Sequence, residues 1–254
     1  MPRRELTYGD LGVVVHPDTA SLGSAAADEA AAVLRDAVAE RGEANAMFAT
    51  GNSQFAFVEA LVARSDIPWP SIRMFHMDEY VGVGPDHPAG FRRWIRERLA
   101  DRLPVREVNY IEGDAADSDA EATRYAGLLQ RHPLDLCCLG IGENGHLAFN
   151  DPPVADFLDP VDVKVVELDQ ACLAQQVGEG HFPTIADVPP TAITVTVPGL
   201  LKSRRVLAIV PEARKAEAVH AALTGPIATS CPASVLRRAR HATLHLDPDS
   251  ARLL

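Results

Sequence analysis

Short apolar runs rich in β-branched residues alternate with longer Ala-, Leu- and Glu-rich segments along the whole chain, and this alternation restricts the fold more than any other feature. Strands that alternate with helices form parallel βαβ units. The pattern therefore predicts an α/β fold of three layers, Rossmann-like, with a mostly parallel sheet covered by helices on both faces. We expect residues 1–254 to form a single domain.

The expected elements follow the chain in order. The predicted strands cover residues 11–15, 46–49, 72–77, 108–111, 134–139, 163–168, 206–210 and 241–246. The predicted helices cover residues 24–41, 53–63, 87–100, 119–130, 169–177, 213–223 and 233–238, and residues 192–197 resume the regular alternation. Prolines interrupt residues 155–190, so we expect this part to form a lid over the rest of the domain.

The charge and the cysteines narrow the class of protein. A formal net charge of -11 disfavours nucleic acid and anionic membranes as partners, although a helix N-terminus can still bind a small anion. The cysteines include no Cys-x-x-Cys pair, which favours reduced thiols over disulfides or a zinc site, and no metal site is expected. Without an apolar run of about 18 residues, the expected location is the cytoplasm. The sequence leaves a homo-oligomer open.

Polar residues gather directly after three predicted strands, which end near residues 49, 77 and 139. Ligands of open parallel sheets bind beyond the carboxyl ends of the strands, so these clusters are the candidate functional sites. The first cluster is Thr50-Gly51-Asn52-Ser53. Glycine allows a tight turn there, and the hydroxyls and the first amides of the next helix can donate to a phosphate. The alternative is an ordinary helix N-cap without a ligand.

The second cluster is Met77-Asp78-Glu79-Tyr80, with two adjacent carboxylates at a strand end. A carboxylate that is partly desolvated in such a place has a raised pKa, which suits proton abstraction. The alternative is a pair of loop acids, one of which caps a backbone amide.

The third cluster begins the loop of residues 140–152, where three glycines in six residues precede His146. The glycines indicate a sharply bent backbone that holds the imidazole close to the strand ends. Glu143 and Asp151 are near in sequence, and a carboxylate partner could poise the imidazole near neutral pH. The loop does not match the first-helix Gly-x-Gly-x-x-Gly of a dinucleotide site well, because Asn150-Asp151-Pro152 interrupts the expected opening of a helix.

Together the clusters carry a resemblance to a known family. The matching stretches are Ala49-Thr50-Gly51-Asn52-Ser53, Phe75-His76-Met77-Asp78-Glu79-Tyr80-Val81-Gly82, Gly140-Ile141-Gly142 to Asn150-Asp151-Pro152, and Ala192-Ile193-Thr194-Val195. They resemble the glucosamine-6-phosphate deaminase (isomerase) family, within the wider group that includes the 6-phosphogluconolactonases. A lactonase would be expected to show different residues after both of the relevant strands, so the deaminase branch is preferred.

The resemblance implies a substrate, a reaction and site residues. The substrate would be an aldose 6-phosphate with a 2-amino group, converted to fructose 6-phosphate and ammonia without a metal or organic cofactor. His146 would open the sugar ring and Asp78 would move the C2 proton to C1. The implied catalytic residues are Asp78, Asn144, His146 and Asp151, with Asp151 orienting His146. The implied substrate and phosphate contacts are Thr50, Gly51, Asn52, Ser53, Glu79, Gly145 and Lys215.

The chain departs from the family pattern at several positions. Asn144 stands where many members have Asp, and Asp151 replaces a Glu. Gln176 stands where the family has an Arg that reaches the phosphate. The C-terminal segment of the allosteric members does not follow the last predicted strand, so activation by an N-acetylated sugar phosphate is not expected. The alternatives left open are an isomerase or lactonase for another phosphosugar, and a non-catalytic sugar-phosphate sensor.

Overall fold

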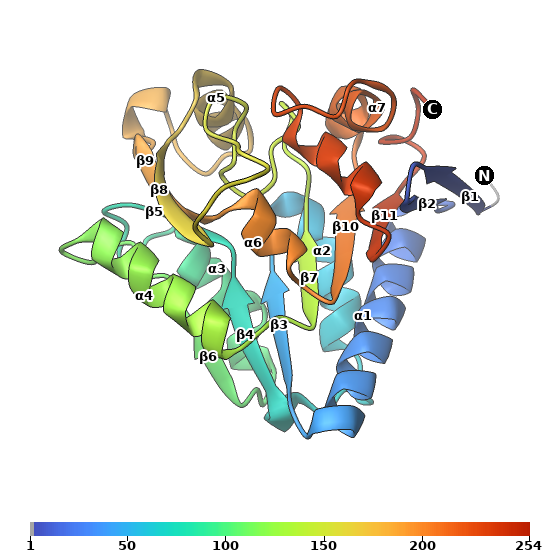
Figure 1. Ribbon diagram of the computed structural model, residues 1–254, viewed down its shortest axis with the longest axis horizontal. Coiled ribbons are helices and arrows are strands. Elements are labelled where there is room, and N and C mark those ends of the chain that lie inside the picture. Colours follow the sequence, from blue (N-terminus) through green and yellow to red (C-terminus); the bar gives the residue numbers. More distant parts are fainter. Residues whose placement is uncertain (1–2) are drawn as a thin grey trace.

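The computed structural model describes residues 3–254 and contains an eight-stranded sheet with helices on both faces (Figure 1). The strand order is β1-β2-β11-β10-β7-β3-β4-β6. Strand β1 pairs with β2 in the antiparallel sense, and every other neighbouring pair is parallel. The predicted fold class is thus confirmed.

The strands agree with the sequence pattern to within a few residues at their ends. Those of the large sheet are β1 (Arg4–Tyr8), β2 (Leu11–Val15), β3 (Ala44–Phe48), β4 (Ile72–His76), β6 (Glu107–Asn109), β7 (Leu136–Leu139), β10 (Arg205–Val210) and β11 (Ala242–Leu246). The sequence analysis missed β1, which is mostly exposed and lacks the apolar residues that mark a buried strand.

Two helical layers bury the faces of the sheet. One layer comprises α1 (Thr19–Arg41), α2 (Phe55–Val62) and α3 (Phe91–Arg98), which pack in one apolar cluster with β3 and β4. The other comprises α4 (Ser118–Arg131), α6 (Val197–Leu201), α7 (Ala216–Thr224) and the 3-10 helix η6 (Pro232–Arg238). Shorter 3-10 turns are η1 (Asn52–Gln54), η2 (Trp69–Ser71), η3 (Ala100–Arg102), η4 (Ile185–Asp187) and η5 (Ala213–Lys215).

Helix α1 begins earlier than the sequence analysis predicted. The Asp18 side chain accepts a hydrogen bond from the Ser21 amide at 2.7 Å, so the helix starts at Thr19 and not at Ser24. Its end was predicted correctly: Gly42 caps it with a φ of 76°. Gly23 faces α2 so closely that a Cβ there would lie 2.5 Å from the Ala56 carbonyl, which explains why α1 has small residues on this side.

A second, three-stranded sheet lies beyond the large one, in the order β5-β9-β8. Its strands are β5 (Asp78–Tyr80), β9 (Thr191–Val195) and β8 (Val163–Glu167), all antiparallel. With α5 (Gln170–Gly178) and η4, strand β8 forms the covering segment, residues 155–190, which lies above the sheet in Figure 1. The short strand β5 was not predicted, because three residues joined directly to β4 show no separate pattern.

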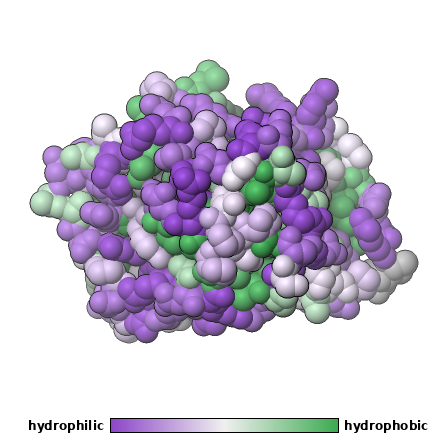
Figure 2. Space-filling model, turned by 90° about the horizontal axis from the view of Figure 1, so that it is seen from below, coloured by the Kyte–Doolittle hydropathy of each residue, from purple (hydrophilic) through white to green (hydrophobic). Residues whose placement is uncertain are grey.

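Seen from below, the face in Figure 2 is mostly hydrophilic, with small apolar areas between the polar ones. Within residues 3–254, no helix combines the length and the apolar character needed to cross a bilayer. None of the four cysteines is in a disulfide, in agreement with the predicted reduced thiols.

A buried histidine pair joins the edge of the sheet to α1. His16, just after β2, lies with Nε2 3.1 Å from Nδ1 of His245 in β11, and the two rings stack. On its other side, His245 lies 3.2 Å from the Glu29 carboxylate. Burial, helped by the neighbouring His245, lowers the pKa of His16 to about 4.

We predict that replacing His16 with Gln destabilises the protein at pH 7 and does so less at low pH. The folded protein keeps His16 neutral until about pH 4, whereas the unfolded chain protonates it near pH 6.5. The stability that neutral His16 contributes is therefore present above pH 6.5 and is lost as the pH falls towards 4. The difference in unfolding free energy between wild type and variant should shrink by up to about 3 kcal/mol over this range. Urea unfolding at several pH values measures it, and a constant difference would contradict the assignment.

Candidate active site

The three polar clusters meet in one cavity at the carboxyl ends of β3, β4 and β7. Strand β3 pairs with β4 on one side and with β7 on the other, so the loops that follow these strands are neighbours. About 580 Å³ of space, part of it open to solvent, lies between the residues that line this cavity. The covering segment closes its far side with Gln175, Gln176, Glu179 and His181.

The glycines of the 140–152 loop make room for the imidazole of His146. A Cβ on Gly142 would overlap the His146 ring, so only glycine leaves space for the ring there. Gly145 has a φ of 84°, and Ala148 is one of two non-glycine residues with positive φ among the described residues. The Asn150 side-chain amide donates to Val195 O at 2.8 Å, which ties the loop to β9, and to Leu147 O at 2.7 Å within the loop itself.

His146 is held by a carboxylate and an amide. Its Nδ1 lies 2.8 Å from Asp151 Oδ1, and both side chains are almost completely buried. The Asn144 side chain donates to the same Asp151 oxygen at 2.9 Å and accepts a hydrogen bond from the His146 backbone amide at 3.0 Å. Burial alone would raise the pKa of Asp151, but the interactions with His146 and Asn144 outweigh it and lower the pKa. Asp151 therefore carries a charge next to Nδ1 of His146, and the His146 ring lines the cavity.

Asp78 brings a carboxyl group with a raised pKa to the cavity. It is the first residue of β5 and lines the cavity, although it is only 7% exposed. Burial, followed by repulsion from the Glu79 carboxylate, raises the pKa of Asp78 well above its ordinary value. A raised pKa makes the ionised carboxylate a stronger base, which suits a group that takes up a proton and returns it.

Glu79 has a different task from the substrate contact that the sequence suggested. Its carboxylate accepts hydrogen bonds from the backbone amides of Tyr80, Phe91 and Arg92 at 2.7 to 3.1 Å, and it is absent from the cavity lining. It thus binds the free amides at the start of α3. Burial raises the pKa of Glu79 to about 7, although the hydrogen bonds from these amides act to lower it. The capping alternative therefore describes Glu79, while Asp78 faces the cavity.

The phosphate contacts implied by the sequence are brought together in part. Thr50, Gly51, Ser53 and Lys215 all line the cavity. Burial lowers the pKa of the Lys215 ammonium, despite the nearby carboxylate of Glu179.

Two further residues named from the sequence do not line the cavity. The Asn52 side chain donates to the Glu179 carbonyl at 3.4 Å. Gly145 forms the turn and packs against Cys231, whose Sγ would lie 2.7 Å from a Cβ there. Asn52 and Gly145 therefore support neighbouring parts of the chain and do not face the cavity.

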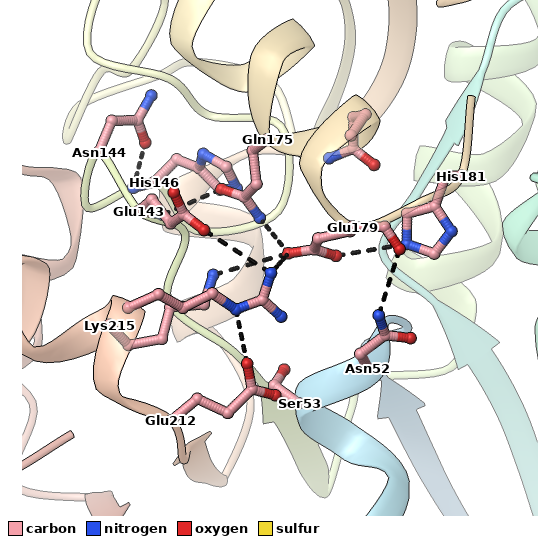
Figure 3. A network of polar contacts seen from close by, with 12 residues as sticks. Asn52, Ser53, Glu143, Asn144, His146, Gln175, Glu179, His181, Glu212 and Lys215 are labelled. Carbon is pink, nitrogen blue, oxygen red and sulfur yellow. Dashed lines mark hydrogen bonds and ion pairs between the residues drawn. The ribbon is translucent and has the colours of Figure 1, made fainter. Parts of the chain in front are cut away.

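The covering segment and η5 supply residues that sequence reasoning missed (Figure 3). They are Gln175, Glu179, His181 and Arg214, of which Arg214 precedes Lys215 and lies 3.1 Å from Glu179. Gln176, which the sequence analysis named in place of an Arg, also lines the cavity and accepts a hydrogen bond from the Tyr80 hydroxyl at 2.6 Å. The signal that could have revealed Arg214 is its position directly after β10, another strand end at this edge of the sheet.

One group of side chains near His146 has the composition of a metal site. The ligand atoms of His146, Asp151 and Cys172 lie within 4.8 Å of one another. Burial raises the pKa of the Cys172 thiol, so the thiolate that binds metals is strongly disfavoured. His146 and Asp151 also already bind each other. The group is better suited to orienting His146 than to holding a cation.

Comparison with known proteins identifies the family. The family described as glucosamine-6-phosphate isomerases/6-phosphogluconolactonase matches residues 17–245. The chain belongs to this family. A glucosamine-6-phosphate deaminase of Listeria innocua is 32% identical over 214 residues, which is 84% of this chain and 89% of that protein. This confirms the resemblance found in the motifs.

Solved structures agree with this assignment. A monomeric glucosamine-6-phosphate deaminase superposes with a TM-score of 0.85 at 28% identity, over 95% of this chain and 99% of that one. A 6-phosphogluconolactonase from Shewanella baltica has a TM-score of 0.73 at 19% identity, over 95% and 97% of the two chains. At that identity the lactonase shares the fold alone.

We predict that Gly142→Ala displaces the His146 ring. The added methyl group cannot fit beside the imidazole, and overpacking of this kind costs roughly 1–3 kcal/mol. The variant should unfold at a lower temperature, and the ring resonances of His146 should shift in nitrogen-15 spectra. Gly12→Ala is the control, because a Cβ there meets nothing within 4 Å. Unchanged His146 resonances in Gly142→Ala would contradict this reading of the loop.

Proposed function

We propose that the protein is a glucosamine-6-phosphate deaminase, which converts glucosamine 6-phosphate and water to fructose 6-phosphate and ammonia. The observation that carries the proposal is the pairing, in one cavity, of the buried Asp78 carboxyl with the His146–Asp151 pair. The deaminases among its relatives support the same substrate. The reaction needs two kinds of proton transfer, and the two groups match them.

The first transfer opens the sugar ring. The closed pyranose must lose the proton of its C1 hydroxyl and gain one on its ring oxygen. His146 can take the first proton and return it to the second oxygen, while Asp151 stabilises the charged imidazolium between these events. Gly142 makes room for the imidazole at this place beside Asp151.

The second transfer converts the aldose to a ketose. Asp78, as carboxylate, removes the proton at C2 of the open-chain aldehyde while the aldehyde oxygen gains a proton from water, which gives a planar enolamine intermediate. The same carboxyl group then returns the proton to the adjacent C1 on the same face, and the amino nitrogen loses a proton to water, which leaves an imine at C2 and a hydroxyl group at C1. Water adds to this imine and ammonia leaves. The raised pKa of Asp78 suits a group that must hold a proton between two steps.

The phosphate end of the substrate fits the other side of the cavity. Thr50 and Ser53 offer hydroxyl groups at the turn between β3 and η1. Lys215 supplies positive charge in the same cavity, and Arg214 precedes it in the chain and pairs with Glu179. A phosphosugar held here would extend its other end towards His146 and Asp78.

The test is to incubate the purified protein with glucosamine 6-phosphate and follow both ammonia and fructose 6-phosphate. We expect both products in equal amounts, and we expect Asp78→Asn to slow turnover by roughly 10²–10⁴-fold, the usual worth of a general acid–base group. Asp36→Asn on the exposed side of α1 is the matched control and should keep wild-type rates. No product from the wild type would remove the substrate assignment and direct the search to other phosphosugars or to sensing.

A further inference from the structure

The centre of the predicted phosphate site is filled by a side chain of the covering segment. Glu179 follows α5 and points its carboxylate towards the loop of residues 50–53 and towards η5 (Figure 3). Its Oε1 lies 3.1 Å from Arg214 Nη1 and 3.9 Å from Lys215 Nζ. Its Oε2 would lie 3.9 Å from a Cβ on Gly51. The carboxylate is therefore between the glycine of the loop and the two cations.

The same carboxylate is firmly held and charged. Gln175 donates to Oε1 at 2.8 Å, and His181 Nε2 lies 3.3 Å from Oε2. The side chain is only 8% exposed, and burial alone would raise its pKa, but His181, Lys215 and Arg214 lower it to about 2. Glu179 is thus an ionised oxyanion in contact with the groups that a phosphate would use.

Two anions cannot share this place. A phosphate bound to Gly51, Ser53 and Lys215 would lie against the Glu179 carboxylate, and like charges at such short range repel strongly where water is largely excluded. The phosphate of the substrate must therefore either displace the Glu179 side chain or bind more weakly, because the negative charge of Glu179 repels it.

We propose that Glu179 is an internal competitor for the phosphate subsite, which lowers the affinity of this site for phosphate and leaves it when the phosphate of the substrate binds. The inference rests on the proposed function only in taking residues 50–53 and Lys215 as the phosphate subsite. While no phosphate is bound, the Glu179 carboxylate neutralises the positive charges of Arg214 and Lys215. It also selects against free phosphate, because only a ligand with further contacts to the cavity gains enough to displace the carboxylate.

The chain offers a matched control for this competitor. Glu212 also contacts Arg214, at 2.5 Å, but its side chain is 36% exposed and does not line the cavity. Its contact with Lys215 is through the backbone, where the Lys215 amide donates to the Glu212 carbonyl at 3.1 Å. Glu212→Gln therefore removes the same charge from the same arginine without emptying the subsite, so it distinguishes local occupation from a general change in charge.

The experiment is isothermal titration calorimetry of the full chain with inorganic phosphate as the probe. Glu179→Gln should bind phosphate at least about tenfold more tightly than the wild type, and Glu212→Gln within about twofold of it. Glu179→Asp, which withdraws the carboxylate by one methylene, should lie between, and circular dichroism confirms that each variant is folded. Equal or weaker phosphate binding by both Glu179 variants would overturn the proposal, as would equal gains in Glu179→Gln and Glu212→Gln.

Phosphate binding does not depend on turnover, so this result is separable from the proposed function. Tighter phosphate binding by Glu179→Gln without conversion of glucosamine 6-phosphate by the wild type would leave Glu179 as the competitor and remove the deaminase assignment. Conversion by the wild type with unchanged phosphate binding in Glu179→Gln would retain the deaminase and remove the competitor.

Discussion

The parallel pairing of β3 with both β4 and β7 is the constraint on which the site depends. Parallel strands place their carboxyl ends at one edge, and the registers here align Phe48 with His76 and with Cys138. Three loops that lie up to about a hundred residues apart in the chain are thus brought together by the pairing of the strands that precede them. The phosphate loop, the Asp78 carboxyl and the His146 loop each begin one or two residues after these paired positions.

Burial then sets the chemistry of the groups that reach this edge. Asp78 and Glu79 are adjacent and both buried, yet they differ in role because Glu79 is bound by three backbone amides and Asp78 faces the cavity. Charge on Glu79 helps to raise the pKa of Asp78. The capping of α3 and the proton affinity of Asp78 are therefore linked, because the Glu79 carboxylate both accepts hydrogen bonds from the first amides of α3 and repels the Asp78 carboxylate. His146 shows the opposite arrangement, in which Asp151 stays ionised beside it.

Much of this could be read from the sequence, and what could not has physical reasons. Alternation of strands and helices gave the fold class, and polar residues after strand ends gave Asp78, His146 and the loop at Gly51. The direction of a side chain at a strand end is not visible in the pattern, so Glu79 was expected at the substrate and instead caps α3. Glu179 and Arg214 were missed because they meet only through packing of the covering segment on η5. Gly142 was recognised as part of a bent loop, but its contact with the His146 ring needed coordinates.

The account centres on one buried carboxyl group that carries a proton from C2 to C1. The most direct measurement uses glucosamine 6-phosphate with deuterium at C2, in ordinary water, and reads the deuterium content at C1 of the fructose 6-phosphate by mass spectrometry and NMR. Because Asp78 is almost completely shielded from solvent, the account predicts that a measurable share of the deuterium appears at C1, in a single stereochemical position. Product with no deuterium at C1 from the earliest turnovers, or with deuterium in both positions at C1, would contradict it.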